Sequence, residues 1–543
     1  MAKRDPRVRQ YGREKRAVGK SSSGETSLPA VPVRKVDLTR LVRTVMLNYG
    51  FWPDFPEKIE KEVQRFSLKS PDAWTEEPIA DLRELLWSSI DNVDSRDLDQ
   101  LEFCERRPRQ EIRTLVAIAD VDAFVNKGCA TDQHASHNAA SVYTGVQIFP
   151  MLPERLCTDL SSLNEGTDRL AVVIEFFVCR DGCVRAGEVF RAWVHNKAKL
   201  IYEEIGDWLE GQAELPAGAA AIDGLAEQLR LQDEAAGRLH EYRMTQGALE
   251  LETIEASPVV ADGKVVDLVV KHKNRARSLI ENFMVAANGT MVQFLEKRQI
   301  PYIQRIVPTP ERWPRIVELA QSLGDSLPEV ADSRSLSEFL ARRRFADRDS
   351  FPDLSLTIVK LLGAGEYVLA EPGKDHDGHF GLAVHDYTHS TAPNRRYVDV
   401  IIQRLLKSVL AKENSPYKKP ELAQIAAWCT QQDKAAKKVE RFMRKVAAAV
   451  LLQGRVGDVF DAIVTGASDK GTYVRLLEKP AEGRVMRGQE GMDVGQKVRV
   501  RLIDLDAEKG HIDFERAGMR MMQKLYAPTV KAVRKMRPRG LSR

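Results

Sequence analysis

The hydrophobic pattern of the chain changes its period near residue 453. Before that point, apolar residues recur at helical spacing over long stretches, most clearly in 275–299, 396–412 and 421–452. From about 453 to 515 they alternate with polar residues in short segments separated by glycines. A sequence with a helical period does not pack as a strand, and the reverse also holds. We therefore expect a large mixed part followed by a small all-β barrel.

The outward strand positions of the expected barrel are basic, and Tyr473 lies among them. Barrels of the OB type bind single-stranded nucleic acid through basic grooves and aromatic platforms. We therefore predict that Tyr473 stacks on a nucleic-acid base. The alternative is a structural barrel whose lysines and arginines are only solvated.

An acidic run in the mixed part carries Asp91, Asp94, Asp97 and Asp99 within nine residues. Carboxylates this close repel each other unless cations neutralise them. Mg²⁺ prefers oxygen ligands and shares them with substrate phosphates, so the run predicts a metal site. A calcium EF-hand loop is excluded because Arg96 replaces the glycine that such a loop requires. The alternative is a solvated acidic loop.

The composition is that of an ordinary globular protein. The 543 residues, 43% hydrophobic and 29% charged, allow two to four domains. The chain contains neither an 18-residue apolar stretch nor a secretory signal, so we expect a cytoplasmic protein that does not associate with membranes. The six cysteines form no C-x-x-C pair and are expected to be reduced thiols.

Both ends of the chain are basic, although the net charge is only +4. Residues 1–20 hold eight Lys and Arg against two acids, and residues 516–543 hold nine against none. Basic arms on a nearly neutral body suggest a polyanionic partner. Tails of this kind also aid solubility, which is the alternative explanation.

The N-terminal region divides into two predicted segments. Residues 1–35 are expected to be a disordered basic tail. Residues 36–80 are expected to form a short helical module, with helices over 37–49 and 57–67. A winged-helix or helix-turn-helix arrangement is one option for this module. From residue 81 onward, the patterns predict mixed α and β structure.

Three further segments, taken with the acidic run, resemble the ribonuclease II (RNB) family of exoribonucleases. They are 143–153, 280–288 and 387–399, which read YTGVQIFPMLP, IENFMVAAN and YTHSTAPNRRYVD. Their order and spacing are similar to those of the family's catalytic domain. The resemblance implies an α+β protein with a mixed α/β RNB catalytic domain over 81–448. An S1-like OB-fold RNA-binding barrel over 449–516 and a basic tail over 517–543 would follow.

The resemblance also implies an activity and a set of site residues. The activity would be processive 3′→5′ hydrolysis of single-stranded RNA to nucleoside 5′-monophosphates, by a monomer that uses Mg²⁺ or alternatively Mn²⁺. The implied metal ligands are Asp91, Asp97, Asp99 and Gln100, and the implied catalytic residues are Asp97, Asp99 and Arg395. The implied RNA-binding residues are Tyr143, Tyr202, Glu281, Arg395, Arg396 and Glu440, with Tyr473 in the barrel.

The chain departs from the family at Gln100, which stands where the family has a second adjacent aspartate. An amide oxygen can still bind Mg²⁺, but the site loses one negative charge. Either the ion binds more weakly, or another acid such as Asp94 or Glu102 takes part. A catalytically inactive RNA-binding regulator on the same fold is therefore the alternative function. A DNA exonuclease is a third option.

Overall fold

A computed structural model describes residues 36–67, 79–254, 256–261, 263–270, 273–348, 350–374, 377–468 and 471–518. The predicted disordered tail, 1–35, and the basic C-terminal tail from 519 onward lie outside the described residues. None of the helices in the described part of the chain combines the length and apolarity that crossing a bilayer requires.

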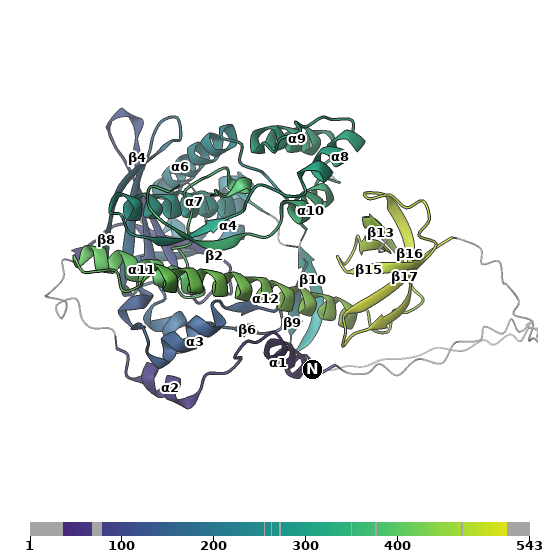
Figure 1. Cartoon of the computed structure of the whole chain (residues 1–543), viewed down its shortest axis with the longest axis horizontal. Helices are drawn as coiled ribbons and strands as arrows, with labels where there is room; N and C mark the ends of the chain where they lie inside the picture. Colours follow the sequence, from purple (N-terminus) through teal and green to yellow (C-terminus); the bar gives the residue numbers. More distant parts are fainter. Residues whose placement is uncertain are drawn as a thin grey trace, which may run out of the picture. The chain divides into compact units, whose positions relative to one another are not determined.

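The described residues form a large α/β part and a small barrel, as expected from the change of period (Figure 1). The helices are α1 (Leu38–Asn48), α2 (Glu57–Gln64), α3 (Ala130–Asn138), α4 (Tyr202–Leu209), α5 (Ala217–Ala220), α6 (Leu225–Thr245), α7 (Arg275–Lys297), α8 (Trp313–Ser322), α9 (Ser333–Ala346), α10 (Phe351–Leu362), α11 (Tyr397–Leu410) and α12 (Lys419–Leu451). The strands of the α/β part are β1 (Ala80–Asp81), β2 (Trp87–Asp91), β3 (Gln100–Arg106), β4 (Ile112–Ala119), β5 (Val142–Tyr143), β6 (Ile148–Phe149), β7 (Asp168–Val178), β8 (Val184–Ile201), β9 (Ala256–Ala261), β10 (Lys264–Val270), β11 (Tyr302–Ile306) and β12 (Glu366–Ala370).

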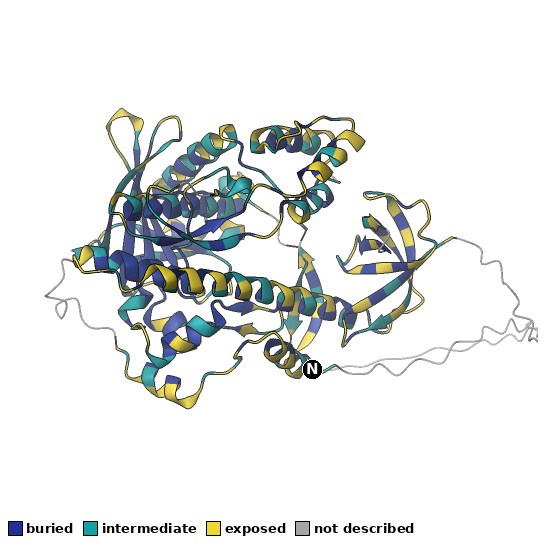
Figure 2. Ribbon diagram, in the orientation of Figure 1, coloured by how far each residue is buried: buried dark blue, intermediate teal, exposed yellow. Residues whose placement is uncertain are grey.

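A six-stranded sheet with the order β1-β8-β2-β3-β4-β7 forms the centre of the α/β part. The long strand β8 pairs antiparallel with β7 and parallel with β2, so the sheet curls back on itself. Its strands are buried along most of their length (Figure 2). A hairpin turn at Gly182 joins β7 and β8, and this glycine has φ +85°. A Cβ there would lie 2.0 Å from the Arg238 carbonyl oxygen of α6, so the turn packs tightly against that helix.

Among the helices of the α/β part, the short α5 and the longer α3 and α10 were not anticipated by the apolar pattern. α3 buries polar side chains, among them Thr131, Asp132 and His134, and therefore lacks the apolar stripe that predicts a helix. α10 begins at Phe351 with Pro352 in its first turn, and it packs with α8 and α9 around a separate apolar cluster.

The predicted N-terminal helices are present, but they do not share a core of their own. The buried face of α1 belongs to a cluster that includes Val439 and Met443 of α12. The buried residues of α2, Ile59 and Val63, belong to the main core beneath the large sheet. The interpretation of 36–80 as a separate winged-helix or helix-turn-helix module therefore needs correction. Each helix is amphipathic, and each is covered by a different part of the α/β structure.

The C-terminal region is a closed barrel, which confirms the predicted OB-type domain. Its strands are β13 (Val459–Ser468), β14 (Gly471–Leu476), β15 (Glu482–Arg487), β16 (Lys497–Asp506) and β17 (His511–Arg516). They pair in the order β13-β14-β15-β17-β16, and the barrel closes between β16 and β13. Among the described strands of the barrel, β15 and β17 form the only parallel pair. Buried and exposed residues alternate along these strands (Figure 2).

The barrel is joined to the α/β part by buried contacts as well as by α12. Arg475 of β14 makes two hydrogen bonds to the Asp353 carboxylate of α10, at 2.8 and 3.2 Å, and both side chains are buried. Lys479 pairs with Asp267 of β10 at 2.5 Å. Leu268 of the same strand belongs to the apolar core of the barrel.

Candidate active site

A cavity of about 440 Å³ opens beside the end of β2 and the start of β3. Its walls come from the acidic run, from the segment around Tyr143, from one face of α7 and from the segment 387–396. Eight residues predicted from the sequence line it: Asp91, Asp97, Asp99, Gln100, Tyr143, Tyr202, Arg395 and Arg396. The fold therefore brings together residues that are up to 305 positions apart in the chain.

The loop between β2 and β3 holds the aspartates in place by hydrogen bonds to its own residues and to β8. The Asp91 carboxylate accepts hydrogen bonds from the Ser95 hydroxyl at 2.6 Å and from the Asn92 amide at 2.8 Å. Lys199 of β8 donates to the Ser95 carbonyl oxygen at 2.6 Å. Asp91 thus has an ordered environment and lines the cavity.

Asp99 is the most deeply buried of the aspartates, with 3% of its surface exposed. Its carboxylate accepts a hydrogen bond from the Asn394 amide at 3.0 Å and another from Arg395 Nε at 3.3 Å. Burial raises the pKa of Asp99 to about 7, although the nearby Arg395 charge acts in the opposite direction. Because the Arg395 side chain is 44% exposed, it can reach both Asp99 and a ligand in the cavity.

Asp97 and Tyr143 form a second contact in the cavity. The Tyr143 hydroxyl donates to Asp97 Oδ2 at 3.3 Å, and burial raises the pKa of the Asp97 carboxyl. The backbone amide of Tyr143 donates to Glu440 Oε1 of α12 at 3.0 Å. Glu440 therefore contacts the backbone of the predicted stacking residue and is not among the residues that line the cavity.

Arg396 and Arg395 are adjacent in the chain but differ in their partners. Arg396 makes two hydrogen bonds to the buried Asp399 carboxylate, from Nε at 3.0 Å and from Nη2 at 2.8 Å. Asp399 in turn accepts a hydrogen bond from the Ala392 amide. Arg396 thus holds the loop that presents Arg395, although part of its side chain also lines the cavity.

Besides Glu440, two further predicted RNA-binding residues lie outside the cavity. Glu281 is not among the residues that line it, and it pairs with Lys273 at 2.7 Å and with Arg243 of α6 at 3.4 Å. Tyr473 lies on β14 of the barrel, where 41% of its surface is exposed. Glu281 is therefore placed as a partner of basic side chains between α6 and α7, whereas Tyr473 occupies an exposed position as expected.

Several cavity residues were missed by the sequence reasoning. Arg277, Ile280, Met284 and Asn288 all line the cavity from α7. Their spacing of three, four and four residues places them on one face of the helix, which is the signal that could have revealed them. The Arg277 guanidinium lies 4.3 Å from the centre of the Tyr202 ring and orients that ring at the cavity wall.

The donor set of the cavity fits a hard divalent cation. The carboxylates of Asp91, Asp97 and Asp99 and the amide oxygen of Gln100 are all oxygen ligands. Such ligands suit Mg²⁺ or Mn²⁺. The raised pKa values of Asp97 and Asp99 are those of buried carboxylates without enough positive charge nearby. A divalent cation would remove this deficit, and these four residues would hold it.

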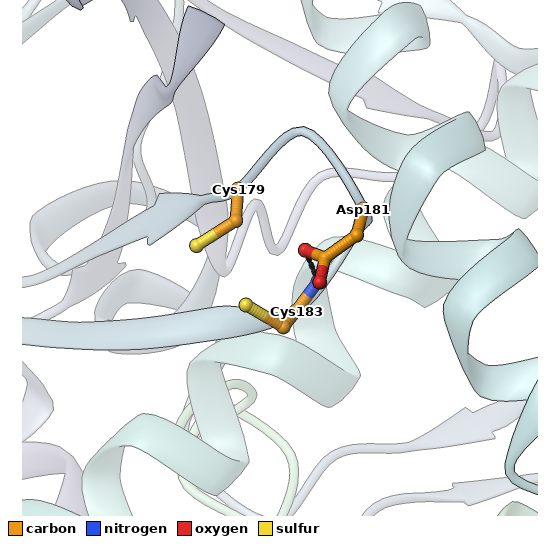
Figure 3. Close-up of side chains that lie close together, drawn as sticks. All are labelled: Cys179, Asp181 and Cys183. Carbon is orange, nitrogen blue, oxygen red and sulfur yellow. Dashed lines mark hydrogen bonds between the residues drawn. The ribbon is translucent and has the colours of Figure 1, made fainter. Parts of the chain in front are cut away.

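A different group of potential metal ligands lies on the turn between β7 and β8 (Figure 3). The ligand atoms of Cys179, Asp181 and Cys183 lie within 4.8 Å of one another, and no other such group occurs in the described ranges. The Asp181 carboxylate accepts a hydrogen bond from the Cys183 amide at 3.2 Å. Thiolate ligands suit soft cations rather than Mg²⁺, and none of the three residues lines the cavity.

The histidines near the arginine segment are not placed for acid–base chemistry in the cavity. His389 is partly buried, and its Nδ1 lies 2.7 Å from the Tyr367 hydroxyl. Burial first, and the nearby arginines second, hold the pKa of His389 well below its usual value. His389 is not among the residues that line the cavity, so a neutral histidine here supports the loop and does not carry a proton to a ligand.

Comparisons with known proteins agree with the fold. The RNB domain model matches residues 79–412, and the model for the RNase II-type exonuclease C-terminal S1 domain matches residues 458–517. Ribonuclease R of Aquifex aeolicus is 28% identical over 503 residues, which cover 87% of this chain and 70% of that protein. For other ribonuclease R proteins of the same identity, the chain spans 60–64% of their length.

Solved structures share the fold at lower identity. Mycoplasma genitalium RNase R in complex with ribose methylated single-stranded RNA matches with a TM-score of 0.80 and 22% identity, over 88% of this chain and 78% of that one. Yeast Ssd1, described as a pseudonuclease, matches with a TM-score of 0.66 and 16% identity, over 82% of this chain and 55% of that one. The same fold thus occurs in a nuclease and in a pseudonuclease.

Proposed function

Because the chain belongs to the RNB domain family, we propose that it is a 3′→5′ exoribonuclease that hydrolyses RNA. In this proposal the enzyme acts processively on single-stranded RNA and releases nucleoside 5′-monophosphates. It uses Mg²⁺, with Mn²⁺ as the alternative ion, and acts as a monomer in the cytoplasm. The relatives named ribonuclease R support the activity.

The contact between Asp99 and Arg395 inside the cavity is the observation that carries the proposal. It brings together the carboxylate that we propose binds the metal and the guanidinium that we propose binds the phosphate. In this proposal Asp91, Asp97 and Asp99 hold the cation, and Gln100 offers its amide oxygen. The bound cation would lower the pKa of a water molecule and neutralise charge on the phosphate.

The other cavity residues orient the RNA in this proposal. Arg395 presents a planar fork of donors to the phosphate at which the chain is cut, where negative charge develops. Tyr143 stacks on a base near the 3′ end, and such stacking contributes about 1–3 kcal/mol per base without reading the sequence. Tyr202, oriented by Arg277, forms a second aromatic wall.

A catalytically inactive RNA-binding regulator is the second candidate function. Gln100 favours it because the site carries one negative charge fewer than the family's acidic run, and the likeness to the Ssd1 pseudonuclease shows that the fold alone does not decide. Asp99 and Arg395 favour the enzyme. Burial raises the pKa of Asp99, so its charged form is unfavourable for folding. A neutral residue at this position would therefore not lower the stability of the fold.

The experiment that separates these functions follows the fate of labelled RNA. Single-stranded RNA labelled at its 5′ end is incubated with the full chain in Mg²⁺ or in EDTA, and the products are resolved by length and by chromatography. Progressive shortening with release of 5′-monophosphates, abolished by EDTA, is expected. RNA that is bound but remains intact in Mg²⁺ and in Mn²⁺ would identify the inactive regulator.

Two variants and a second substrate serve as controls for this experiment. Asp97→Asn should abolish shortening, whereas Asp94→Asn should not, because Asp94 is exposed in the same loop and does not line the cavity. Single-stranded DNA of the same sequence tests the DNA exonuclease option. Equal hydrolysis of RNA and DNA would contradict the assignment to RNA. Light scattering of the eluting protein tests the proposed monomer.

A further inference from the structure

A buried acid beneath the cavity lacks the partners that such a group requires. Glu102 of β3 has 0% of its surface exposed, and neither of its carboxylate oxygens has a hydrogen-bond partner among the described residues. No lysine or arginine in the described part of the chain forms an ion pair with it either. Burying an unpaired carboxylate costs several kcal/mol, so buried carboxylates are normally paired or bind metals.

The position of Glu102 links it to the cavity. Because side chains alternate along a strand, Glu102 lies on the same face of β3 as Gln100, which lines the cavity. Glu102 is paired with Ser88 of the antiparallel strand β2, which ends three residues later at Asp91. Glu102 therefore lies two residues beyond Gln100 on the same face of β3, and Gln100 stands where the family has its second aspartate.

The neighbouring groups act on Glu102 as this position implies. Burial raises the pKa of Glu102, and the negative charge of Asp91 raises it further. The pKa of the cavity residue Tyr202 is raised by burial first and then by the charges of both Asp91 and Glu102.

The polar groups closest to Glu102 in the fold do not satisfy its carboxylate. Gln232 of α6 donates to the backbone oxygen of Glu102 at 3.2 Å and not to its side chain. The Ser88 hydroxyl, opposite Glu102 in the ladder, has no hydrogen-bond partner among the described residues. The carboxylate therefore has no hydrogen-bond partner among the described residues, and it lies behind Gln100 rather than among the residues that line the cavity.

We propose that Glu102 is a relocated carboxylate of the metal site, which acts with Asp91 on the divalent cation and replaces the charge that Gln100 lacks. It binds the cation directly or through a water molecule in the cation's own shell. The inference rests on the proposed function, because the cation is the one proposed for the cavity. It adds that the acidic run is completed by a residue two positions further along β3.

The test measures Mn²⁺ binding to the full chain without RNA, by the electron paramagnetic resonance signal of free Mn²⁺. Glu102→Gln, which keeps the shape of the side chain and removes its charge, should weaken Mn²⁺ binding about 10- to 100-fold. The double variant Gln100→Asp with Glu102→Gln should restore binding to within a few-fold of wild type. Mn²⁺ affinity of Glu102→Gln equal to that of wild type would overturn the inference.

A matched control and a variant that leaves Glu102 in place complete the experiment. Glu105→Gln removes the same charge from the same strand, but Glu105 pairs with Arg107 at 3.0 Å and with Arg113 at 3.3 Å, so Mn²⁺ binding should not change. Gln100→Asp alone should change Mn²⁺ affinity less than threefold, since Glu102 already supplies the charge. A tenfold or larger gain from Gln100→Asp alone would contradict the proposal even if Glu102→Gln did not fold.

The outcome is separable from that of the proposed function. If the wild-type chain binds Mn²⁺ through Glu102 but leaves RNA intact, the nuclease proposal fails and the assignment of Glu102 stands. If RNA is hydrolysed and Glu102→Gln binds Mn²⁺ as wild type does, the assignment fails and the nuclease stands. Thermal unfolding in EDTA shows whether Glu102→Gln is folded, and this variant should be at least as stable as wild type without metal.

Discussion

The cavity and the barrel are both proposed to contact RNA, but they place their charges differently. In the cavity, Asp99 is buried and touches Arg395 directly. On the barrel, Arg499 and Arg501 of β16 are exposed, and their nearest acids lie 3.6–3.9 Å away. Charges in a buried site act strongly and depend on position, whereas exposed charges are screened by water and salt. The cavity is thus suited to chemistry and the barrel to affinity.

The largest expected effect is at Asp99. Asp99→Asn should lower the turnover of saturating RNA about 10³-fold, because it removes a charge that contacts both the cation and Arg395. The affinity for RNA should stay within about threefold, since the aromatic contacts and the barrel remain. Single-turnover kinetics and fluorescence anisotropy measure the two quantities. On the barrel, Asp461→Asn should leave turnover unchanged. A loss of turnover in Asp461→Asn as large as that in Asp99→Asn would contradict the different roles of the cavity and the barrel.

The next effect separates the two adjacent arginines. Arg395→Ala should reduce turnover about 10²-fold without lowering the melting temperature, because its partner Asp99 is already able to take up a proton. Arg396→Ala should instead destabilise the fold by about 3–5 kcal/mol, since it leaves the buried Asp399 carboxylate unpaired. Urea unfolding and RNA hydrolysis of both variants check this. Equal stability of the two variants would contradict the assigned roles.

A smaller effect concerns the pH dependence of stability. The Asp99 carboxyl, whose pKa burial raises to about 7, binds a proton more readily in the folded than in the unfolded protein. Without metal, its contribution to stability is therefore complete below about pH 4 and is lost as the pH rises through about 7. A cation would offset this loss, so the increase in melting temperature caused by Mg²⁺ should be larger at pH 8 than at pH 5.

The barrel offers a control for this pH effect. The pKa of Asp506 is lowered by its hydrogen bond from Lys509, which is the opposite direction, and both groups are exposed. The increase in melting temperature caused by Mg²⁺ should therefore differ between pH 5 and pH 8 in Asp506→Asn as it does in wild type. Asp99→Asn should remove most of this difference. Melting curves in EDTA and in Mg²⁺ across this pH range provide the measurement. A Mg²⁺ effect independent of pH in wild type would contradict the metal assignment.

The smallest effect is expected on the barrel surface. Tyr473→Ala should weaken RNA binding by about 1 kcal/mol, or about fivefold, through the loss of one stacked base. Arg484, exposed and opposite Tyr473 in the strand pair, should contribute through a phosphate, so Arg484→Ala should lower the salt dependence of binding by about one unit of slope. Turnover at saturating RNA should be unchanged in both variants. Unchanged affinity and salt dependence would support the alternative of a purely structural barrel.

Much of the fold and of the cavity could be predicted because local signals and the family resemblance agree. The alternation after residue 453 predicted the barrel, and the acidic run and the arginine segment supplied Asp91, Asp99 and Arg395 to one cavity. The role of Glu281 in RNA binding stays a prediction: the residue shares a face of α7 with Arg277 and Met284, which line the cavity, but it is paired with Arg243 and Lys273. The motif places Glu281 on that face, but it does not specify which side chains of neighbouring segments pair with it.

The sequence by itself determined most of the segments that become helices and strands, which residues could bind a cation, and that a barrel follows the α/β part. Those properties depend on residues close together in the chain, through periodicity, charge spacing and motif order. Only the tertiary structure decided that α1 and α2 pack in separate cores, that Arg396 is held by Asp399 while Arg395 faces the cavity, and that Glu102 is buried without a partner. Burial and pairing depend on which distant segments meet, and no local pattern contains that information.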